Sequence, residues 1–317
     1  MGSTPTTRIP LGRLELRCPP LPHTLVEALD LVDHPEQIEV RTVTAMLERD
    51  PLVVARLLQT VNSAYYGLHR TVSSPERAVV MLGPVAVVGI IVGMSMLRLR
   101  SVLDGPAGSC FSQLIRHSVA TAYLTSFLLD EAAEPDAPKV HPARRGAGFT
   151  AGLLHDFGKI ILVYNFPTEA VALYEEQALS AHVSTDDFRE MESLLFGSDH
   201  TEAGEFAALK LHFPEPLTRV IRHHHAPERA GGGAAAEALV GAVAVANLAA
   251  HAMGHGFGSP ATWEDALADP AWSLYAARTP AFTVDTLAET LEARQDDLDR
   301  YVQAFADPQP TRRLRKV

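Results

Sequence analysis

The sequence has few cysteines, and nothing near its start resembles a secretion signal. Its 317 residues include two cysteines, Cys18 and Cys110. Two thiols cannot build a disulfide framework or a multi-cysteine zinc site, and such sparse use is typical of a reducing cytoplasm. The first residues also lack a charged n-region followed by an apolar h-region. We therefore expect a cytoplasmic protein.

Basic residues and long apolar runs are also scarce. The chain has 27 Lys and Arg against 38 Asp and Glu, a formal charge of -11. A general nucleic-acid binder normally has a basic surface, so this balance argues against that class. The exception is a basic tail over residues 307–317, which we interpret as a solvated charged segment. The most apolar run, Pro84 to Leu99, contains two glycines and is shorter than the ~20 residues that cross a bilayer, so we expect a buried helix there.

Strand signals are missing, because no stretch combines period-two alternation with hairpin turn chemistry. Helix signals are frequent instead. Asp50 places an N-cap before Pro51, and apolar residues then recur at helical spacing as far as Val61. The sequence predicts an all-α protein. Besides this helix and one that follows an Asp199 cap, the expected helices cover approximately residues 22–33, 40–49, 84–99, 111–130, 149–164, 167–180, 185–196, 214–225, 235–254 and 284–305.

Clusters of glycine and proline predict the boundaries within the chain. One cluster, Leu103 to Gly108, separates an N-terminal helical subdomain over residues 11–104 from a histidine-bearing subdomain over residues 109–256. Residues 254–280 are expected to be irregular, and a last helix follows over 280–306. We expect the two subdomains to pack into one body, because the apolar helix of the first needs burial on several sides.

An adjacent pair, His155 and Asp156, interrupts the apolar stretch over 148–164. Burying an ionisable pair without partners is costly, so both side chains need a metal ion or a polar network. Imidazole and carboxylate together suit divalent transition metals. From the residues alone, a metal site and a set of satisfied core or surface histidines are both open interpretations. Further histidines in suitable places are His117, His200, His223, His224 and His225.

Six segments in a fixed order resemble the HDOD family. This family is related to the HD metal-dependent phosphohydrolases and occurs in bacterial signalling. The resemblance implies an N-terminal helical subdomain packed on an HD-like helical subdomain. The segments are CPPLPHTLVEALDLV, ERDPLVVARLLQTVNSAYYGLHRTVSSPERAVVMLG, RHSVATAYL, AGLLHDFGKIIL, FGSDHTEAGEFAALKLHFPEPL and IRHHHAPE.

The resemblance to the catalytic relatives also implies a site for a divalent metal, which could be iron, manganese or zinc. Lys159 matches a lysine that helps to hold the phosphate, so Lys159 and Asp156 would be the catalytic residues of a phosphohydrolase. The implied metal ligands are His117, His155, Asp156, His200, His224 and His225.

The sequence departs from the catalytic pattern in two places. The last acidic ligand of HD enzymes falls near Asn247, where a neutral amide weakens both the charge balance and the metal affinity. Ala226, Pro227 and Glu228 follow the histidine run in place of the glutamate, glycine and GYP segment of the cyclic di-GMP phosphodiesterases. That segment helps to form the cyclic dinucleotide pocket, so its absence counts against this activity.

Two functions therefore compete. The first is a bacterial regulatory protein that binds a signalling protein or a small nucleotide ligand and does not catalyse a reaction. The alternative is a metal-dependent phosphohydrolase acting on a nucleotide or phosphate ester. Tyr65 and Tyr66 could line a ligand or partner groove, although aromatic residues beside a helix end are more often core. We expect neither a membrane nor nucleic acid as a partner.

Overall fold

The structure, a computed structural model, describes residues 16–32, 38–62, 71–103, 105–131, 142–179, 185–257, 262–279 and 283–306. Within these ranges every regular element is a helix and no strand occurs. The predicted all-α class is therefore confirmed. Tyr65, Tyr66 and the basic tail over 307–317 lie outside the described residues.

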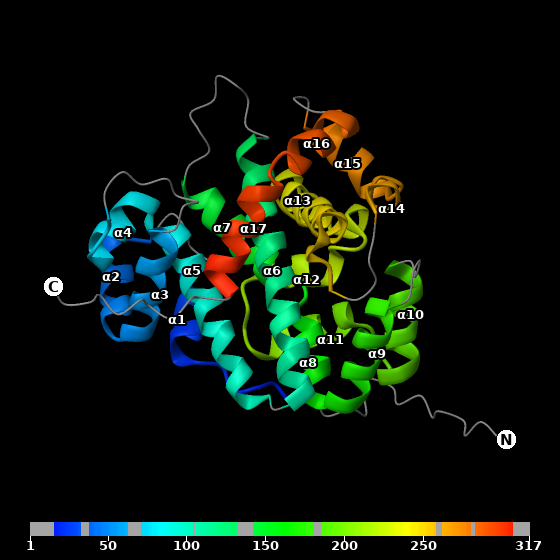
Figure 1. Ribbon diagram of the computed structural model, residues 1–317, viewed down its shortest axis with the longest axis horizontal. Coiled ribbons are helices and arrows are strands. Elements are labelled where there is room, and N and C mark those ends of the chain that lie inside the picture. The colour runs from blue at the N-terminus through cyan, green and yellow to red at the C-terminus, as the bar shows by residue number, and fades with distance from the viewer. Residues whose placement is uncertain are drawn as a thin grey trace.

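The first helices form a group at one side of the molecule (Figure 1). Asp50 caps one of them as predicted, since its Oδ1 accepts a hydrogen bond from the Val53 amide at 3.2 Å. Helix α5 (Pro84–Leu97) is buried continuously from Val87 to Met96, which confirms the predicted buried helix. These elements are α1 (His23–Val32), α2 (Val40–Glu48), α3 (Pro51–Val61), α4 (Pro75–Leu82), α5 (Pro84–Leu97) and the 3-10 helix η4 (Arg98–Val102).

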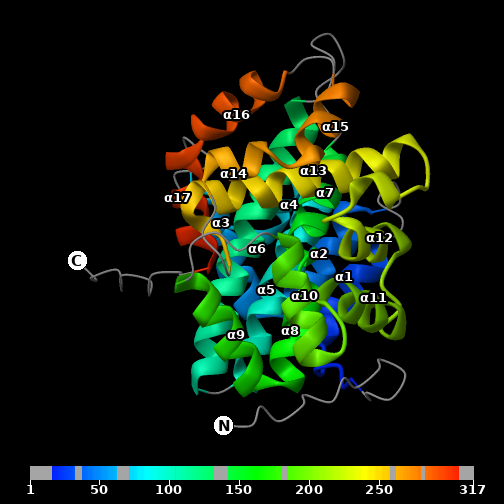
Figure 2. The same cartoon turned by 90° about the vertical axis from the view of Figure 1, so that its right-hand side faces the viewer.

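The central helices are arranged around the long helix α6 (Gly105–Glu131). Figure 2 shows α8 and α9 toward the lower end of the molecule, with α13 above them and α15 and α16 at the top. The other central helices are α7 (Pro142–Leu154), α8 (Phe157–Asn165), α9 (Pro167–Leu179), α10 (Thr185–Phe196), α11 (His200–Lys210), α12 (Glu215–His223) and α13 (Ala234–Ala250). A 3-10 helix, η5 (Pro227–Arg229), precedes α13, and a π-helix, η6 (His251–His255), follows it.

Four further helices complete the C-terminal part: α14 (Trp263–Leu267), α15 (Pro270–Arg278), α16 (Val284–Glu292) and α17 (Gln295–Ala306). The prediction of an irregular segment over 254–280 was wrong, because α14 and α15 lie there. Both begin at side-chain caps, with Thr262 accepting from the Asp265 amide and Asp269 accepting from the Ala271 amide. Such caps satisfy backbone donors that a short helix would otherwise leave unpaired.

Two predicted helices are each broken in the structure. The helix expected over 149–164 is α7 and α8, separated by a turn at His155 and Asp156. The helix expected over 284–305 is α16 and α17, separated by a turn after Glu292. Apolar residues continue at helical spacing through both breaks. The sequence pattern therefore does not reveal the two turns, which tertiary contacts stabilise.

One hydrophobic core connects the N-terminal helices to the histidine-bearing ones. Helix α5 packs against α1 and α3 on one side and against α7 on the other, and α17 contacts both α3 and α6. The predicted packing of the two helical groups is therefore confirmed. The boundaries that we assigned to them from the sequence remain a prediction.

By length and apolar composition, the helical stretch Ala234–His255 could cross a membrane, as could the α4–α5 pair, Pro75–Leu82 and Pro84–Arg100, if taken as one span. However, 61% of the apolar window in Ala234–His255 is buried inside the protein, and the α4–α5 pair is bent by 118°. Burial of this kind is what a core helix of a globular protein shows.

Helices α8 and α11 approach each other through two glycines. A Cβ added to Gly158 would lie 1.7 Å from the His200 carbonyl oxygen and 2.8 Å from the Gly204 amide nitrogen. Both of these atoms belong to the backbone, so a rotamer change cannot relieve the clash. Gly158 therefore sets the distance between α8 and the start of α11, where His200 lies.

We expect Gly158→Ala to lower the free energy of unfolding by ~3 kcal/mol, the upper end of the usual cost of overpacking, because the backbone atoms that it meets cannot move aside. The control is Gly241→Ala in α13, where an added Cβ meets only Tyr275 at 3.4 Å. Since alanine favours a helix interior over glycine, this control should be neutral or stabilising by up to ~1 kcal/mol. Urea denaturation measures both, and equal effects of the two substitutions would contradict the account.

Candidate metal centre

The turn between α7 and α8 directs His155 and Asp156 into the interior. Their exposed fractions are 0% and 1%. The His155 Nδ1–H donates to the Gly152 carbonyl oxygen at 2.7 Å, which leaves Nε2 facing the cluster. Gly152 also allows α7 to approach α6, because a Cβ there would lie 2.7 Å from the Ala122 Cα. The local backbone thus brings His155 toward a histidine of α6.

That histidine is His117, which is fully buried. Its Nδ1–H donates to the His255 carbonyl oxygen at 2.9 Å, and its Nε2 lies 3.3 Å from the Nε2 of His155. The Oδ2 atom of Asp156 is 3.5 Å from the Nε2 of His117 and 3.4 Å from that of His155. These three residues form one potential metal-binding group.

A second group shares the same carboxylate. Asp156 Oδ1 lies 3.4 Å from the Nε2 of His200 and 3.6 Å from the Nε2 of His224. His225 joins them, since its Nε2 is 3.1 Å from that of His200. The ligand atoms of these four residues all lie within 4.8 Å of one another. Asp156 therefore offers one oxygen to each group.

The outer nitrogen, Nδ1, of four of these rings forms a hydrogen bond with an oxygen acceptor outside the cluster. His200 donates from Nδ1 to Glu192 Oε2 at 2.6 Å, and His224 donates from Nδ1 to the Val220 and Ile221 carbonyl oxygens at 3.1 Å each. Since these oxygens accept hydrogen bonds, each Nδ1 carries the proton and each Nε2 of a neutral ring carries a lone pair. Hydrogen bonds of this kind orient histidines that ligate metals.

The resulting contacts between Nε2 atoms are unfavourable without a cation. The Nε2 atoms of His117 and His155 lie 3.3 Å apart, and those of His200 and His224 lie 3.4 Å apart. Where both rings of a pair are neutral, the two lone pairs face each other and cannot form a hydrogen bond. Asp156 Oδ1 also has no hydrogen-bond partner among the described residues. These unpaired acceptors form a donor set that fits a divalent metal ion.

The electrostatics of the cluster preserve this donor set at neutral pH. Burial, together with the neighbouring His251 and His155, lowers the pKa of His117 well below its usual range. Burial also lowers the pKa of His224 to about 3. For Asp156, burial raises the pKa, but His155 and Lys159 outweigh this effect and hold it well below the usual value. An ionised carboxylate thus lies near the neutral imidazoles of His117 and His224.

Lys159 lies beside the carboxylate, as its place after the His–Asp pair implied. Its Nζ donates to Asp156 Oδ2 at 2.7 Å, and the residue is 4% exposed. The ammonium group partly neutralises Asp156, but its hydrogen bond is made to Oδ2. Oδ1 is therefore left without a hydrogen-bond partner among the described residues.

Sequence reasoning missed Glu192, which supports the site from α10. This carboxylate is fully buried, and besides the ring of His200 it accepts from the His200 amide at 2.9 Å and from the Tyr174 hydroxyl at 2.9 Å. Burial and then the nearby Glu192 charge raise the pKa of Tyr174 well above its usual value. A glutamate on the apolar side of a predicted helix was the available signal.

Sequence reasoning also missed His251 as a neighbour of the cluster. Its ring centroid lies 4.8 Å from that of His117 in an edge-to-face arrangement. Asn247 precedes it by one helical turn and therefore shares its face of α13. The Asn247 side chain is buried, and its Oδ1 finds no partner within the described part of the chain.

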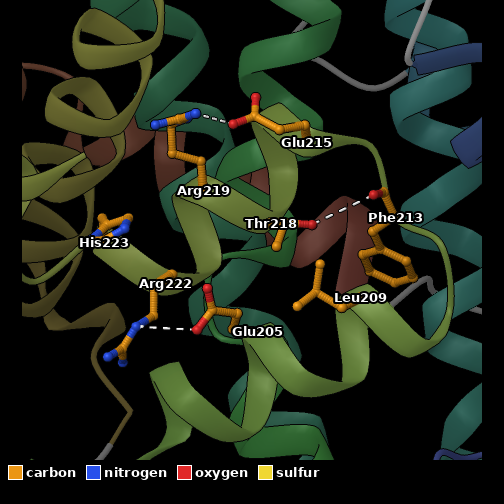
Figure 3. A pocket seen from close by; sticks show the side chains of 8 residues that line it. All are labelled: Glu205, Leu209, Phe213, Glu215, Thr218, Arg219, Arg222 and His223. Atoms are coloured by element: carbon orange, nitrogen blue, oxygen red, sulfur yellow. Dashed lines mark hydrogen bonds and ion pairs between the residues drawn. The ribbon is translucent and has the colours of Figure 1, made fainter. Parts of the chain in front are cut away.

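The structure brings together all of the predicted ligand residues, although their role as metal ligands remains a prediction. His223 differs from the two histidines that follow it. It lines a surface groove of about 280 Å³ between α11 and α12, together with Arg219 and Arg222 (Figure 3). His223 therefore lies at the surface groove, whereas His224 lies in the buried cluster.

The described residues thus form a helical fold around a buried cluster of histidines and one aspartate. The HDOD domain family model matches residues 18–227, so the chain belongs to the HDOD family. A curated relative, an uncharacterised protein of Treponema pallidum (strain Nichols), is 24% identical over 237 residues. The match covers 73% of this chain and 41% of that protein, so the chain spans about two fifths of the relative's length.

Solved structures share the fold at low sequence identity. An HDOD domain protein of unknown function from Geobacter sulfurreducens has a TM-score of 0.73 and 22% identity, covering 91% of this chain and 93% of that one. A candidate phosphohydrolase from Shewanella amazonensis SB2B has a TM-score of 0.63 and 22% identity, and the match covers 91% of this chain and 95% of that one. A candidate signal transduction protein from Marinobacter aquaeolei VT8 has a TM-score of 0.67 and 18% identity, and the match covers 92% of this chain and 60% of that one.

The lowered pKa values of His117 and His224 predict that acid destabilises the metal-free protein. Below an unfolded-state pKa of about 6.5 the unfolded chain binds protons that the folded chain does not. The free energy of unfolding should therefore fall as the pH falls from 6.5 toward the folded-state values, by up to ~1.4 kcal/mol per pH unit for each ring.

Urea denaturation with a chelator present, between pH 7.5 and pH 5, measures this slope. His224→Gln should make the slope shallower. His23→Gln is the control, because the His23 side chain is 82% exposed and should leave the slope unchanged. A free energy of unfolding that is flat over this range would show that the buried rings take up protons in the folded state.

Proposed function

We propose that this HDOD protein is a bacterial regulatory protein that acts by binding, and that its His/Asp cluster is a structural metal centre. The carrying observation is burial of five of the six cluster residues, His225 being the one that is partly exposed. His117, His155 and His224 are at most 1% exposed, as are Asp156 and His200. A phosphoester would have to contact ligand atoms that the protein itself covers. The proposed partner is a signalling protein or a small nucleotide ligand, and the proposed location is the cytoplasm.

The composition of the donor set supports a structural centre. Five imidazoles surround a single carboxylate, and Asn247 supplies a neutral amide where the catalytic relatives have an acidic ligand. This ratio favours zinc or iron over manganese, because carboxylate-rich sites suit manganese. When bound, a divalent ion would neutralise Asp156 and connect ligands that come from different helices.

The supporting hydrogen bonds point in the same direction. The outer nitrogens of four rings are fixed by backbone carbonyls or by Glu192, so the ligand atoms are preorganised. Removing a ligand should therefore affect stability as well as metal affinity, because folding and metal binding are linked. A metal ion that connects several helices would stabilise the fold. This stabilisation is consistent with a module that presents a fixed surface to a partner.

The phosphohydrolase remains the second candidate function. The observation that favours it is the pairing of Lys159 with Asp156 beside the complete set of histidines. In that function, Lys159 would hold a phosphate oxygen and Asp156 would orient the reacting groups. Activity would require the closed cluster to open, because Lys159 is itself 4% exposed.

Cobalt binding, followed by visible absorption, tests the proposed centre. We expect the wild type to bind cobalt and to lose thermal stability when a chelator is added. His155→Gln should weaken binding by at least the ~10–100-fold that loss of an outer-shell partner costs. His23→Gln should bind as the wild type does. Asn247→Asp should strengthen binding, because it adds a charged oxygen ligand.

The same cobalt-loaded samples, and samples loaded with manganese or iron, should show no turnover of cyclic di-GMP or simple phosphoesters. The absent GYP segment and the covered ligands both remove substrate positioning. Turnover at ~1 per second or more, abolished by Asp156→Asn, would establish the phosphohydrolase instead. A wild type that binds no divalent ion would contradict the structural metal centre.

A further inference from the structure

The orientation of His117 depends on a turn that lies outside the family match. The acceptor of its Nδ1–H is the carbonyl oxygen of His255, the last residue of η6. Within this π-helix Gly254 has φ of 77°, a conformation that glycine adopts without strain. π-helical turns occur frequently at functional sites. This backbone carbonyl fixes both the tautomer and the direction of the His117 ring.

Helix α17 holds the same turn on both sides of Gly254. The Gln295 Nε2 donates to the Met253 carbonyl oxygen at 3.2 Å and to Asp299 Oδ1 at 3.0 Å. The His255 Nε2–H donates to Asp299 Oδ1 at 2.7 Å. Asp299 is thus the acceptor that secures the His255 side chain, while the His255 carbonyl secures His117. The side chain of Asp299 is 53% exposed, so it is accessible from the surface.

The other end of α17 packs on the N-terminal helices. Phe305 lies so close to α5 that a Cβ on Gly93 would be 2.5 Å from its Cζ. Tyr301 packs against Tyr123 of α6, with ring centroids 5.3 Å apart. Figure 1 shows α17 lying along α6, beside α5 and α7. One helix therefore contacts both the N-terminal helical group and the turn that orients His117.

We propose that Asp299 is a positioning residue that couples the docking of α17 to the metal centre through His255 and His117. Loss of the Asp299 hydrogen bond frees the His255 side chain, and Gly254 then offers little resistance to rotation of the His255 carbonyl. His117 loses its fixed tautomer, and the group formed by His117, His155 and Asp156 binds metal more weakly. This inference rests on the proposed metal centre.

The test compares Asp299→Ala with Asp296→Ala. Both substitutions remove one carboxylate from the first turns of α17, and Asp296 is an exposed residue. Two readouts are used at a temperature well below the unfolding midpoint of each variant. One is the dissociation constant for cobalt, followed by absorption. The other is the nitrogen and proton resonance of the His117 Nδ1–H in the metal-free protein, assigned by its loss in His117→Gln.

We expect Asp299→Ala to raise the cobalt dissociation constant about tenfold, the low end of the range for outer-shell partners. The His117 Nδ1–H resonance should disappear through exchange with water. Asp296→Ala should keep the resonance and change the dissociation constant by less than about twofold, within the scatter of surface substitutions.

An unchanged His117 resonance in Asp299→Ala would overturn the positioning role, whatever the cobalt affinity. A wild type that binds no cobalt would contradict the metal centre alone, because the resonance still reports the coupling from Asp299 to His117. A general loss of structure is separated from both results by the unfolding midpoints. If Asp299 only stabilised α17, Asp299→Ala would lower the unfolding midpoint and leave the His117 Nδ1–H resonance in place.

Discussion

Asp156 occupies the turn between α7 and α8, and the inward-facing nitrogens of the surrounding histidines converge on its carboxylate. The carboxylate is ionised and buried, with Lys159 as its one charged hydrogen-bond donor among the described residues. Four of the five surrounding rings are held from outside by a backbone carbonyl or by Glu192. The helices are therefore fixed in positions that leave lone pairs facing one another, which costs energy unless a cation lies among them. Gly152 and Gly158 make this convergence sterically feasible by allowing α6, α7, α8 and α11 to approach.

This constraint separates metal binding from catalysis. A catalytic metal site keeps a coordination position open to substrate, whereas a structural site is closed by the protein. The closure of this cluster, the neutral Asn247 and the single carboxylate all favour the closed kind. The HDOD membership of the chain agrees with either function, because fold does not determine activity. The distinction between binding and catalysis therefore lies in the site itself.

Much of the fold follows from local sequence signals, and the ligand residues follow from a family resemblance. The apolar composition of α5 and the Asp50 cap of α3 are local features, and both were predictable. The break between α7 and α8 was not, because apolar residues continue through it and the turn depends on contacts with α6 and α11. The caps at Thr262 and Asp269 are visible in the sequence, but they lie in a stretch whose glycines and prolines favour the prediction of irregular structure. The burial of Glu192 had a signal in its helix pattern, but its hydrogen bonds to His200 did not. The role of the His255 carbonyl could not be predicted, since it contacts a residue 138 positions earlier in the sequence.

X-ray absorption at the metal edge tests the central claim most directly, because it reports the ligand atoms themselves. The purified protein loaded with zinc should show nitrogen or oxygen neighbours at about 2.0–2.2 Å and the outer-shell scattering that is characteristic of several imidazole rings. Asp156→Asn should change this spectrum, because it removes the charged oxygen that both groups share. A spectrum that contains only oxygen neighbours without imidazole scattering would contradict the account, because the ion would then lie outside the histidine cluster.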